Sequence, residues 1–290
     1  RVCRMIGTDA PENFKAYGQE DTEVAYRLLA RVKYLVSNPK ARIFHIEHPY
    51  NDAMSNPVNQ KILEEKMRRP KVTVYIIAYN AASGVEESIQ SVMEQTLQDF
   101  ELIVVDDGST DETGQMLEKY RYHPKIRIFK QPHKGIAAAS NIAVLYARGE
   151  YICPLYQGDR LTPDALEILS RELDEDINIG FIFSGHYKTD NSNQSPVVSN
   201  TYVPGLFISE MPILKSMMWR KSKFILTEGF DKNLLYYFNY DILLKLEEVC
   251  KVKQANSMLY KQNTTESNYN YFEELIFVFC NVFRRRNLQL

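Results

Sequence analysis

The stretch that decides the fold is Lys71–Asp111, KVTVYIIAYNAASGVEESIQSVMEQTLQDFELIVVDDGSTD. Residues 71–80 are mostly β-branched or apolar and are too few to cross a membrane, so they predict a buried strand. Apolar residues recur at helical spacing from Val85 to Leu97, which predicts an amphipathic helix. FELIVVDD at 100–107 predicts a second buried strand. A strand, a helix and a strand in succession predict two parallel neighbours joined by a right-handed crossover.

Polar residues follow both predicted strands. Tyr79 and Asn80 come directly after the first strand, and Asp106, Asp107 and a Gly-Ser turn end the second. In open parallel sheets, ligands bind beyond the carboxyl ends of the strands, so these residues predict a shared binding edge. Carboxylates there could accept hydrogen bonds from a uracil N–H and from ribose hydroxyls. The segment lacks the glycine-rich loop of dinucleotide and ATP binders.

The composition is that of a globular protein. The 290 residues are 44% hydrophobic and carry a formal net charge of −2, which gives no electrostatic case for nucleic acid as a partner. The 4 Cys have no zinc or redox spacing, and we expect reduced thiols. No signal peptide or transmembrane run is visible, so we expect a protein of the cytoplasm, either free or peripheral at the inner face of the membrane. Because the chain begins at Arg1, we interpret it as a piece of a longer protein.

Three segments are predicted along the chain. Residues 1–49 form the tail of a preceding domain, 50–70 a helical linker closed by Pro70, and 71–290 one α/β domain. Thr162 followed by Pro163 predicts a helix start with Thr162 as N-cap. The further predicted elements are strands at 125–130, 151–155, 180–190 and 251–261, helices at 112–120, from 136, at 241–249 and 273–286, and a mobile polar loop at 191–200.

The combined pattern resembles the family 2 glycosyltransferases of the GT-A fold, and more closely the bacterial two-domain chondroitin and hyaluronan polymerases. Besides Lys71–Asp111, the resemblance lies in HKGIAAASNIAVLYARGEYI (133–152), GDRLTPDALE (158–167), WRKSKFILTEGF (219–230) and NYDILLKLEEV (239–249). It implies a Rossmann-like α/β fold, with a mostly parallel twisted sheet and helices on both faces. It also implies that a UDP-sugar, of glucuronic acid or an N-acetylhexosamine, donates its sugar to a glycan or polysaccharide acceptor.

The resemblance implies a set of residues that bind the nucleotide-sugar. Asp107 matches the carboxylate that receives the base; the alternative is that it caps its own turn. Lys134 and Gly135 lie where the family's chain passes the nucleotide, and Asn141 matches the helix near the sugar. The whole implied set is Ala78, Tyr79, Asn80, Asp106, Asp107, Lys134, Gly135 and Asn141.

The positions that handle the metal and the base depart from the family pattern. Where the family has Asp-x-Asp-Asp, this chain has Tyr156, Gln157, Gly158 and Asp159. Asp159 alone either holds Mn²⁺ or Mg²⁺ weakly or caps the turn. Asn239 stands at the general-base position, where an amide cannot accept a proton, and Asp241 follows it as a candidate catalytic or helix-capping residue. Tyr260 replaces a late His, and Lys261 beside it could counter a diphosphate.

The first segment matches the end of the family's first catalytic domain. There Asp21 corresponds to a general base, Gly18, Glu20 and Glu23 fall in the same motif, and His45 corresponds to a later His that binds the metal; the alternative is a solvated acidic face with a structural His. The nucleotide-binding half of that domain is not in this sequence, so a missing catalytic domain is the implied partner. Trp219 either faces an acceptor or packs in the core.

Two functions follow from these residues. The first is a UDP-sugar-dependent, inverting glycosyltransferase whose degenerate metal and base positions make it slow. The second is an inactive module that binds nucleotide or glycan and supports a partner domain.

Overall fold

The computed structural model describes residues 69–190, 193–197, 215–263 and 272–285. The chain divides into two units, Arg1–Arg69 and Pro70–Leu290, and apart from Arg69 all described residues belong to the second. The predictions for residues 1–49 and for the linker at 50–68 therefore lie outside the described residues, and the domain boundaries stay predictions.

The predicted pair of parallel strands forms the centre of the sheet. In β1 (Val72–Ala78) and β2 (Phe100–Asp106) all seven residues of each strand are buried, as expected for strands covered on both faces. They pair in parallel with Val72 beside Phe100 and Ala78 beside Asp106. β3 (Ile126–Lys130) and β4 (Tyr151–Tyr156) add parallel neighbours on either side. The two polar clusters consequently share one edge of the sheet.

The sheet continues beyond β4 with mixed pairing. Its order is β3-β2-β1-β4-β8-β6-β9-β5, with β7 paired to β6. β4 to β8, β8 to β6 and β9 to β5 are antiparallel, whereas β6 and β9 are parallel. The remaining strands are β5 (Arg160–Leu161), β6 (Ile179–Asp190), β7 (Asn193–Val197), β8 (Ser216–Arg220) and β9 (Lys251–Asn263).

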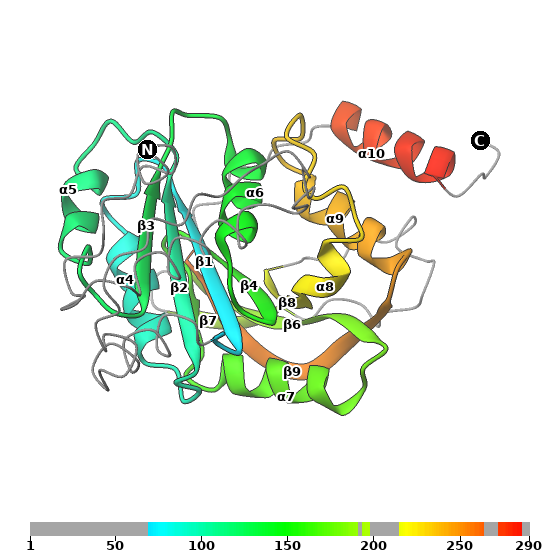
Figure 1. Ribbon diagram of the computed structural model, residues 1–290, viewed down its shortest axis with the longest axis horizontal. Helices are drawn as coiled ribbons and strands as arrows, with labels where there is room; N and C mark the ends of the chain where they lie inside the picture. The colour runs from blue at the N-terminus through cyan, green and yellow to red at the C-terminus, as the bar shows by residue number, and fades with distance from the viewer. Residues whose placement is uncertain (1–68, 191–192, 198–214, 264–271, 286–290) are drawn as a thin grey trace, which may run out of the picture. The chain divides into compact units, whose positions relative to one another are not determined.

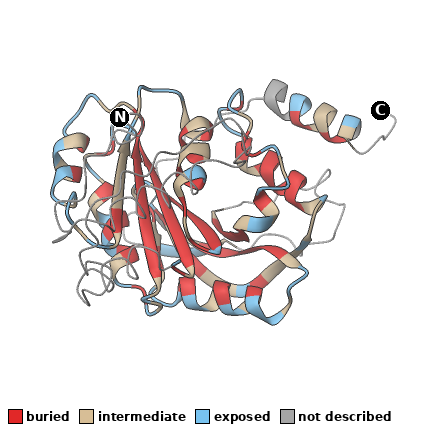
Figure 2. Cartoon of the chain, in the orientation of Figure 1, coloured by how far each residue is buried: buried red, intermediate tan, exposed pale blue. Residues whose placement is uncertain are grey.

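Helices cover both faces of the sheet (Figure 1). On one face Tyr75 and Ile103 pack against α6 (Ile136–Tyr146) and α9 (Phe238–Glu247). On the other face Val74 packs with α4 (Val85–Met93) and α7 (Ala165–Glu175). Figure 2 shows β1, β2 and β4 as a buried layer between them, whereas β3 and β9 are less buried. The shorter or peripheral helices are α5 (Thr113–Glu118), α8 (Lys221–Phe224) and α10 (Phe272–Arg285).

The C-terminus of α4 and the N-terminus of α7 differ from the prediction. The side chain of Gln95, which contacts both, accounts for both differences. α4 ends at Met93 rather than Leu97, and buried Gln95 turns back to donate hydrogen bonds to the carbonyls of Ser91 and Thr162, at 3.0 and 2.7 Å. Its own Oε1 accepts from the N–H of Leu166 at 3.0 Å. The prediction of Thr162 as the N-cap of α7 was wrong, because a residue 71 positions earlier in the chain satisfies that first turn.

The loop predicted at 191–200 is in part a strand. β7 pairs antiparallel with β6 from Asp190–Asn193 to His186–Val197, so these residues close a hairpin. Trp219 is fully buried, stacked on Phe181 and Phe224 with ring centroids 6.2 and 5.9 Å apart, so it packs in the core. Among the helices in the described ranges, none is both long and apolar enough to cross a membrane.

Candidate functional site

Tyr79 and Asn80 follow β1 and reach across to the turn that follows β2. Asn80 has a positive φ of 48°, a left-handed conformation that Asn tolerates better than most residues. Its Oδ1 accepts a hydrogen bond from the N–H of Thr110 at 2.9 Å, and its own N–H donates to Ser109 Oγ at 3.1 Å. The two polar clusters expected at this edge are therefore joined by direct hydrogen bonds.

The two carboxylates after β2 point to different places. Asp106 is buried and accepts from the N–H of Ser109 at 2.9 Å, which fixes the turn. Asp107, only 1% exposed, accepts from the backbone N–H groups of Lys134 and Gly135, at 3.0 and 2.9 Å. The carbonyl of Ala78, at the end of β1, accepts from the N–H of Asp107 at 2.9 Å.

Two side chains complete the shell of Asp107. Gln131 Nε2 donates to Oδ1 at 2.5 Å, and His133 Nδ1 lies 2.9 Å from Oδ2. With two backbone donors as well, the roughly four acceptor positions of a carboxylate are filled. Asp107 thus orders the loop that leads into α6, whereas Asp106 is the carboxylate that caps the turn after β2; a contact of Asp107 with a base stays a prediction.

The ordered loop presents an aromatic face and a cation. The ring of Tyr79, 39% exposed, stacks on His133 with centroids 4.0 Å apart. Lys134 is exposed, and Gly135 takes a φ of 87° that a side chain would rarely adopt, immediately before α6. Of the residues expected to bind the nucleotide, the structure brings together Ala78, Tyr79, Asn80, Asp106, Asp107, Lys134 and Gly135.

The turn after β4 is bound to the same edge. The side-chain amide of Gln157 accepts from the N–H of Tyr79 at 2.8 Å and donates to the Tyr79 carbonyl at 3.2 Å, which extends the β1–β4 pairing by one side chain. Tyr156 contacts Asn239 of α9 through its hydroxyl, which accepts from the Asn239 amide. Burial raises the pKa of the Tyr156 phenol well above its ordinary value, so this hydroxyl stays neutral.

Asp159 turns inward, away from the edge. The hydroxyl of Tyr260 donates to its Oδ2 at 2.6 Å, and the N–H of Asn263 donates to its Oδ1 at 2.9 Å. Burial raises the pKa of Asp159, while these two hydrogen bonds and the charge of Lys215 oppose the shift. Both oxygens hold the β4–β5 turn against β9.

The residues at this turn do not fit a divalent cation. Such an ion needs several oxygen ligands, whereas Gly158 has no side chain, Tyr156 is a neutral phenol, and each oxygen of Asp159 already accepts one hydrogen bond from the protein. No group of three or more His, Cys, Asp or Glu side chains gathers anywhere in the part of the chain that the structure describes. Three of the altered positions take part in two contacts: Tyr156 with Asn239, and Tyr260 with the retained Asp159.

Lys215 is a residue of this site that the sequence did not indicate. Its ammonium lies 4.7 Å from the centre of the Tyr156 ring, and its charge acts on Asp159. The residue is half-buried and directly precedes β8. It belongs to none of the motifs that carry the resemblance, so only the pairing of β8 with β4 could have revealed it.

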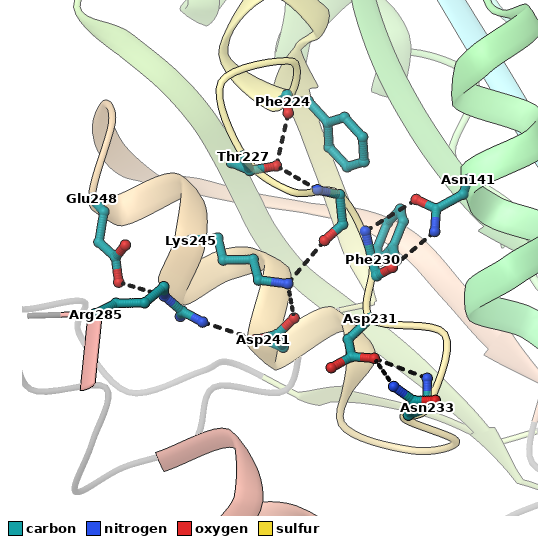
Figure 3. A network of polar contacts seen from close by, with 11 residues as sticks. Asn141, Phe224, Thr227, Phe230, Asp231, Asn233, Asp241, Lys245, Glu248 and Arg285 are labelled. Atoms are coloured by element: carbon teal, nitrogen blue, oxygen red, sulfur yellow. Dashed lines mark hydrogen bonds and ion pairs between the residues drawn. The ribbon is translucent and has the colours of Figure 1, made fainter. Parts of the chain in front are cut away.

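Asn141 and Asp241 belong to a separate polar network (Figure 3). The amide of Asn141 accepts from the N–H of Phe230 at 3.0 Å and donates to the Phe230 carbonyl at 2.8 Å. Lys245 lies 2.6 Å from Asp241 and also donates to the carbonyl of Gly229 at 2.9 Å. Here Asn141 fastens the 229–230 segment to α6, and Lys245, paired with Asp241, fastens it to α9.

The remaining predicted site residues are of two kinds. Lys261 lies in β9 beside Arg160 of β5, one residue after the buried Tyr260. Asp21, with Gly18, Glu20, Glu23 and His45, lies outside the described residues, and the roles expected of these five positions stay predictions.

Comparison with known proteins points to one family. The sequence profile described as Glycosyl transferase family 2 matches residues 73–241. The chain is 32% identical over 278 residues to a chondroitin synthase of Escherichia coli, covering 87% of this chain and 40% of that protein. It is 31% identical over 281 residues to a hyaluronan synthase of Pasteurella multocida, covering 87% of this chain and 28% of that protein. The chain therefore spans less than half the length of these two relatives.

Solved structures share the fold. S. aureus TarS (residues 1–349), solved in complex with UDP-GlcNAc, superimposes with a TM-score of 0.64 and 20% identity, covering 76% of this chain and 68% of that one. At this identity the likeness concerns the fold, and it confirms the expected GT-A architecture.

Proposed function

The chain belongs to glycosyl transferase family 2, and on that premise we propose that it binds a UDP-sugar at the carboxyl edge of β1 and β2. The observation that supports this is the convergence there of Tyr79, Asn80 and the Lys134–Gly135 loop around the turn after β2. The exposed ring of Tyr79 could stack on a base, and the ammonium of Lys134 could bind a phosphate. The backbone at Gly135, which has no side chain, leaves space for the ribose.

The proposed reaction is sugar transfer to a glycan acceptor. In a single in-line displacement, the acceptor hydroxyl attacks the anomeric carbon, its proton passes to a base, and UDP leaves with the electrons of the glycosidic bond. Two relatives of this chain are named for chondroitin and hyaluronan synthesis, which makes a glycosaminoglycan-type acceptor the first to try. We further propose that residues 1–49 belong to a preceding domain, with 50–70 as linker, and that a catalytic domain outside this sequence is the partner.

A second candidate is a non-catalytic module that holds nucleotide or glycan for such a partner domain. The pairing of Tyr156 with Asn239 and of Asp159 with Tyr260 favours it, because both contacts consume groups at the expected metal and base positions. General base catalysis is worth roughly 10²–10⁴-fold, so the loss of the base alone would make transfer slow.

Calorimetric titration with UDP tests the placement of the nucleotide. We expect Asp107→Ala to weaken UDP binding by about 1–3 kcal/mol, because the loop holding Lys134 and Gly135 loses its buried acceptor. Asp174→Ala is the matched control, since Asp174 is hydrogen-bonded to Tyr151 near the opposite end of β4. Equal UDP affinity in the two variants would refute the placement, and so would a wild-type chain that does not bind UDP.

A further inference from the structure

The end of β4 carries a positive charge where the expected cation ligands are absent. β8 runs antiparallel to β4, with Tyr151 beside Arg220 and Ile152 beside Trp219. Continuing this register by four residues brings Lys215 level with Tyr156, in agreement with the 4.7 Å contact between its ammonium and the Tyr156 ring. The contact with Tyr156 therefore places the lysine at the carboxyl end of β4, in line with the register of the two paired residues.

Within the described ranges, no carboxylate lies within 4.0 Å of the Lys215 ammonium, so no direct ion pair neutralises it there. Its charge acts on Asp159, whose pKa it lowers. The oxygens of Asp159 are already engaged with Tyr260 and Asn263. An ammonium over an aromatic face keeps donors for an incoming anion, because the ring occupies only one side of it.

Lys215 also borders the proposed nucleotide edge. Tyr156 pairs with Ile77 in the register of β1 and β4, and the next residue, Gln157, binds both backbone groups of Tyr79. A diphosphate that continues from a nucleoside at Tyr79 toward α9 would pass the end of β4. Its negative charge must be countered there when UDP departs.

We propose that Lys215 supplies this countercharge, so that the chain binds the diphosphate of its donor without a divalent cation. The inference rests on the proposed function and adds to it the means by which the diphosphate is held. Lysine is an established phosphate binder that acts as a point charge, and it fits an edge whose carboxylates are used internally.

The test compares UDP with uridine on the full chain, in EDTA and in Mn²⁺. UDP is titrated by calorimetry, and uridine by ligand-observed NMR at up to millimolar concentration. We expect UDP to bind equally well in both buffers, Lys215→Met to weaken UDP about tenfold or more, and uridine binding to be unchanged. Lys215→Arg should keep most of the affinity. Lys253→Met, which removes a partly buried lysine that pairs with Glu172, should leave UDP binding unaffected.

The outcomes separate the two proposals. If UDP binds only with Mn²⁺, or if Lys215→Met binds UDP as tightly as the wild type, the role of Lys215 is refuted while the nucleotide site stands. If neither UDP nor uridine binds the wild type in either buffer, the nucleotide site itself is refuted. Loss of both UDP and uridine binding in Lys215→Met and in Lys215→Arg would also overturn the inference, because the lysine would then act on the site as a whole and not on the diphosphate.

Discussion

Asp159 follows β4 at the predicted binding edge of the sheet, but its side chain is buried in the interior. Its carboxylate is 4% exposed, and its hydrogen bonds run to Tyr260 and Asn263 of β9. Burial disfavours its charged form and raises its pKa despite these donors. The free energy of unfolding is therefore lower when Asp159 is ionised than when it is protonated.

This shift has a consequence that can be measured. Because the folded-state pKa of Asp159 lies above the unfolded value near 3.8, its contribution is greatest below that value and is lost as pH rises through the folded pKa. Asp159→Asn removes the titration. We expect the wild type to gain free energy of unfolding relative to this variant between pH 7 and pH 4, as measured by urea denaturation. A constant difference across that range would show that Asp159 titrates normally.

Helix α9 is the element on which the interior network depends. Asp241 is 1% exposed, and burial raises its pKa, opposed chiefly by Lys245 one turn along. Arg285 of α10 lies 3.7 Å from the same carboxylate and donates to Glu248 at 3.2 Å (Figure 3). The network therefore joins α9, α10 and the 229–230 segment.

Removing the lysine tests how much this buried pair matters. Lys245→Met leaves Asp241 without its nearest cation and the carbonyl of Gly229 without its donor, and we expect a loss of about 3–5 kcal/mol in the free energy of unfolding. The double variant with Asp241→Asn should recover part of that loss, because no charge is left buried. A single variant within about 0.5 kcal/mol of wild type would contradict this account.

Elements with strong local patterns were predictable, and those set by distant partners were not. β1, β2 and their parallel pairing follow from uninterrupted apolar runs, and the structure confirms them. The start of α7 was missed because its first turn is satisfied by Gln95, which lies on another element. β7 was missed because its sequence, NQSPV, has no apolar pattern of its own. It forms a strand through its pairing with β6.

The same distinction holds for the site. The shared polar edge was predictable because strand ends and polar residues coincide in the sequence, as at Asn80 and Asp107, whereas its binding of a nucleotide stays a proposal. The contact of Tyr156 with Asn239, 83 positions apart, and the place of Lys215 depend on how α9 and β8 fold back onto β4. No local pattern encodes such contacts.

At the scale of the molecule, the two contacts, Tyr156 with Asn239 and Asp159 with Tyr260, indicate which changes would restore metal binding. The combined change Tyr156→Asp, Gly158→Asp and Asn239→Asp adds carboxylates but leaves Asp159 bound to Tyr260. We expect Mn²⁺ binding, followed by electron paramagnetic resonance, to stay weak in this triple variant. It should strengthen only when Tyr260→His frees an oxygen of Asp159 and adds a nitrogen ligand. Tight Mn²⁺ binding by the triple variant alone would contradict the argument.

The central claim is that this chain keeps the nucleotide-binding edge of its family but has lost its metal and base functions. The residues at those positions are hydrogen-bonded within the protein, Tyr156 to Asn239 and Asp159 to Tyr260. The most direct measurement is the turnover of UDP-glucuronic acid and UDP-N-acetylhexosamines by the unmodified chain, with a glycosaminoglycan acceptor, in EDTA and in Mn²⁺. We expect UDP release far below about 1 s⁻¹ in both buffers, under conditions where UDP binding is measurable. Mn²⁺-dependent transfer at about 1 s⁻¹ or faster would contradict the claim.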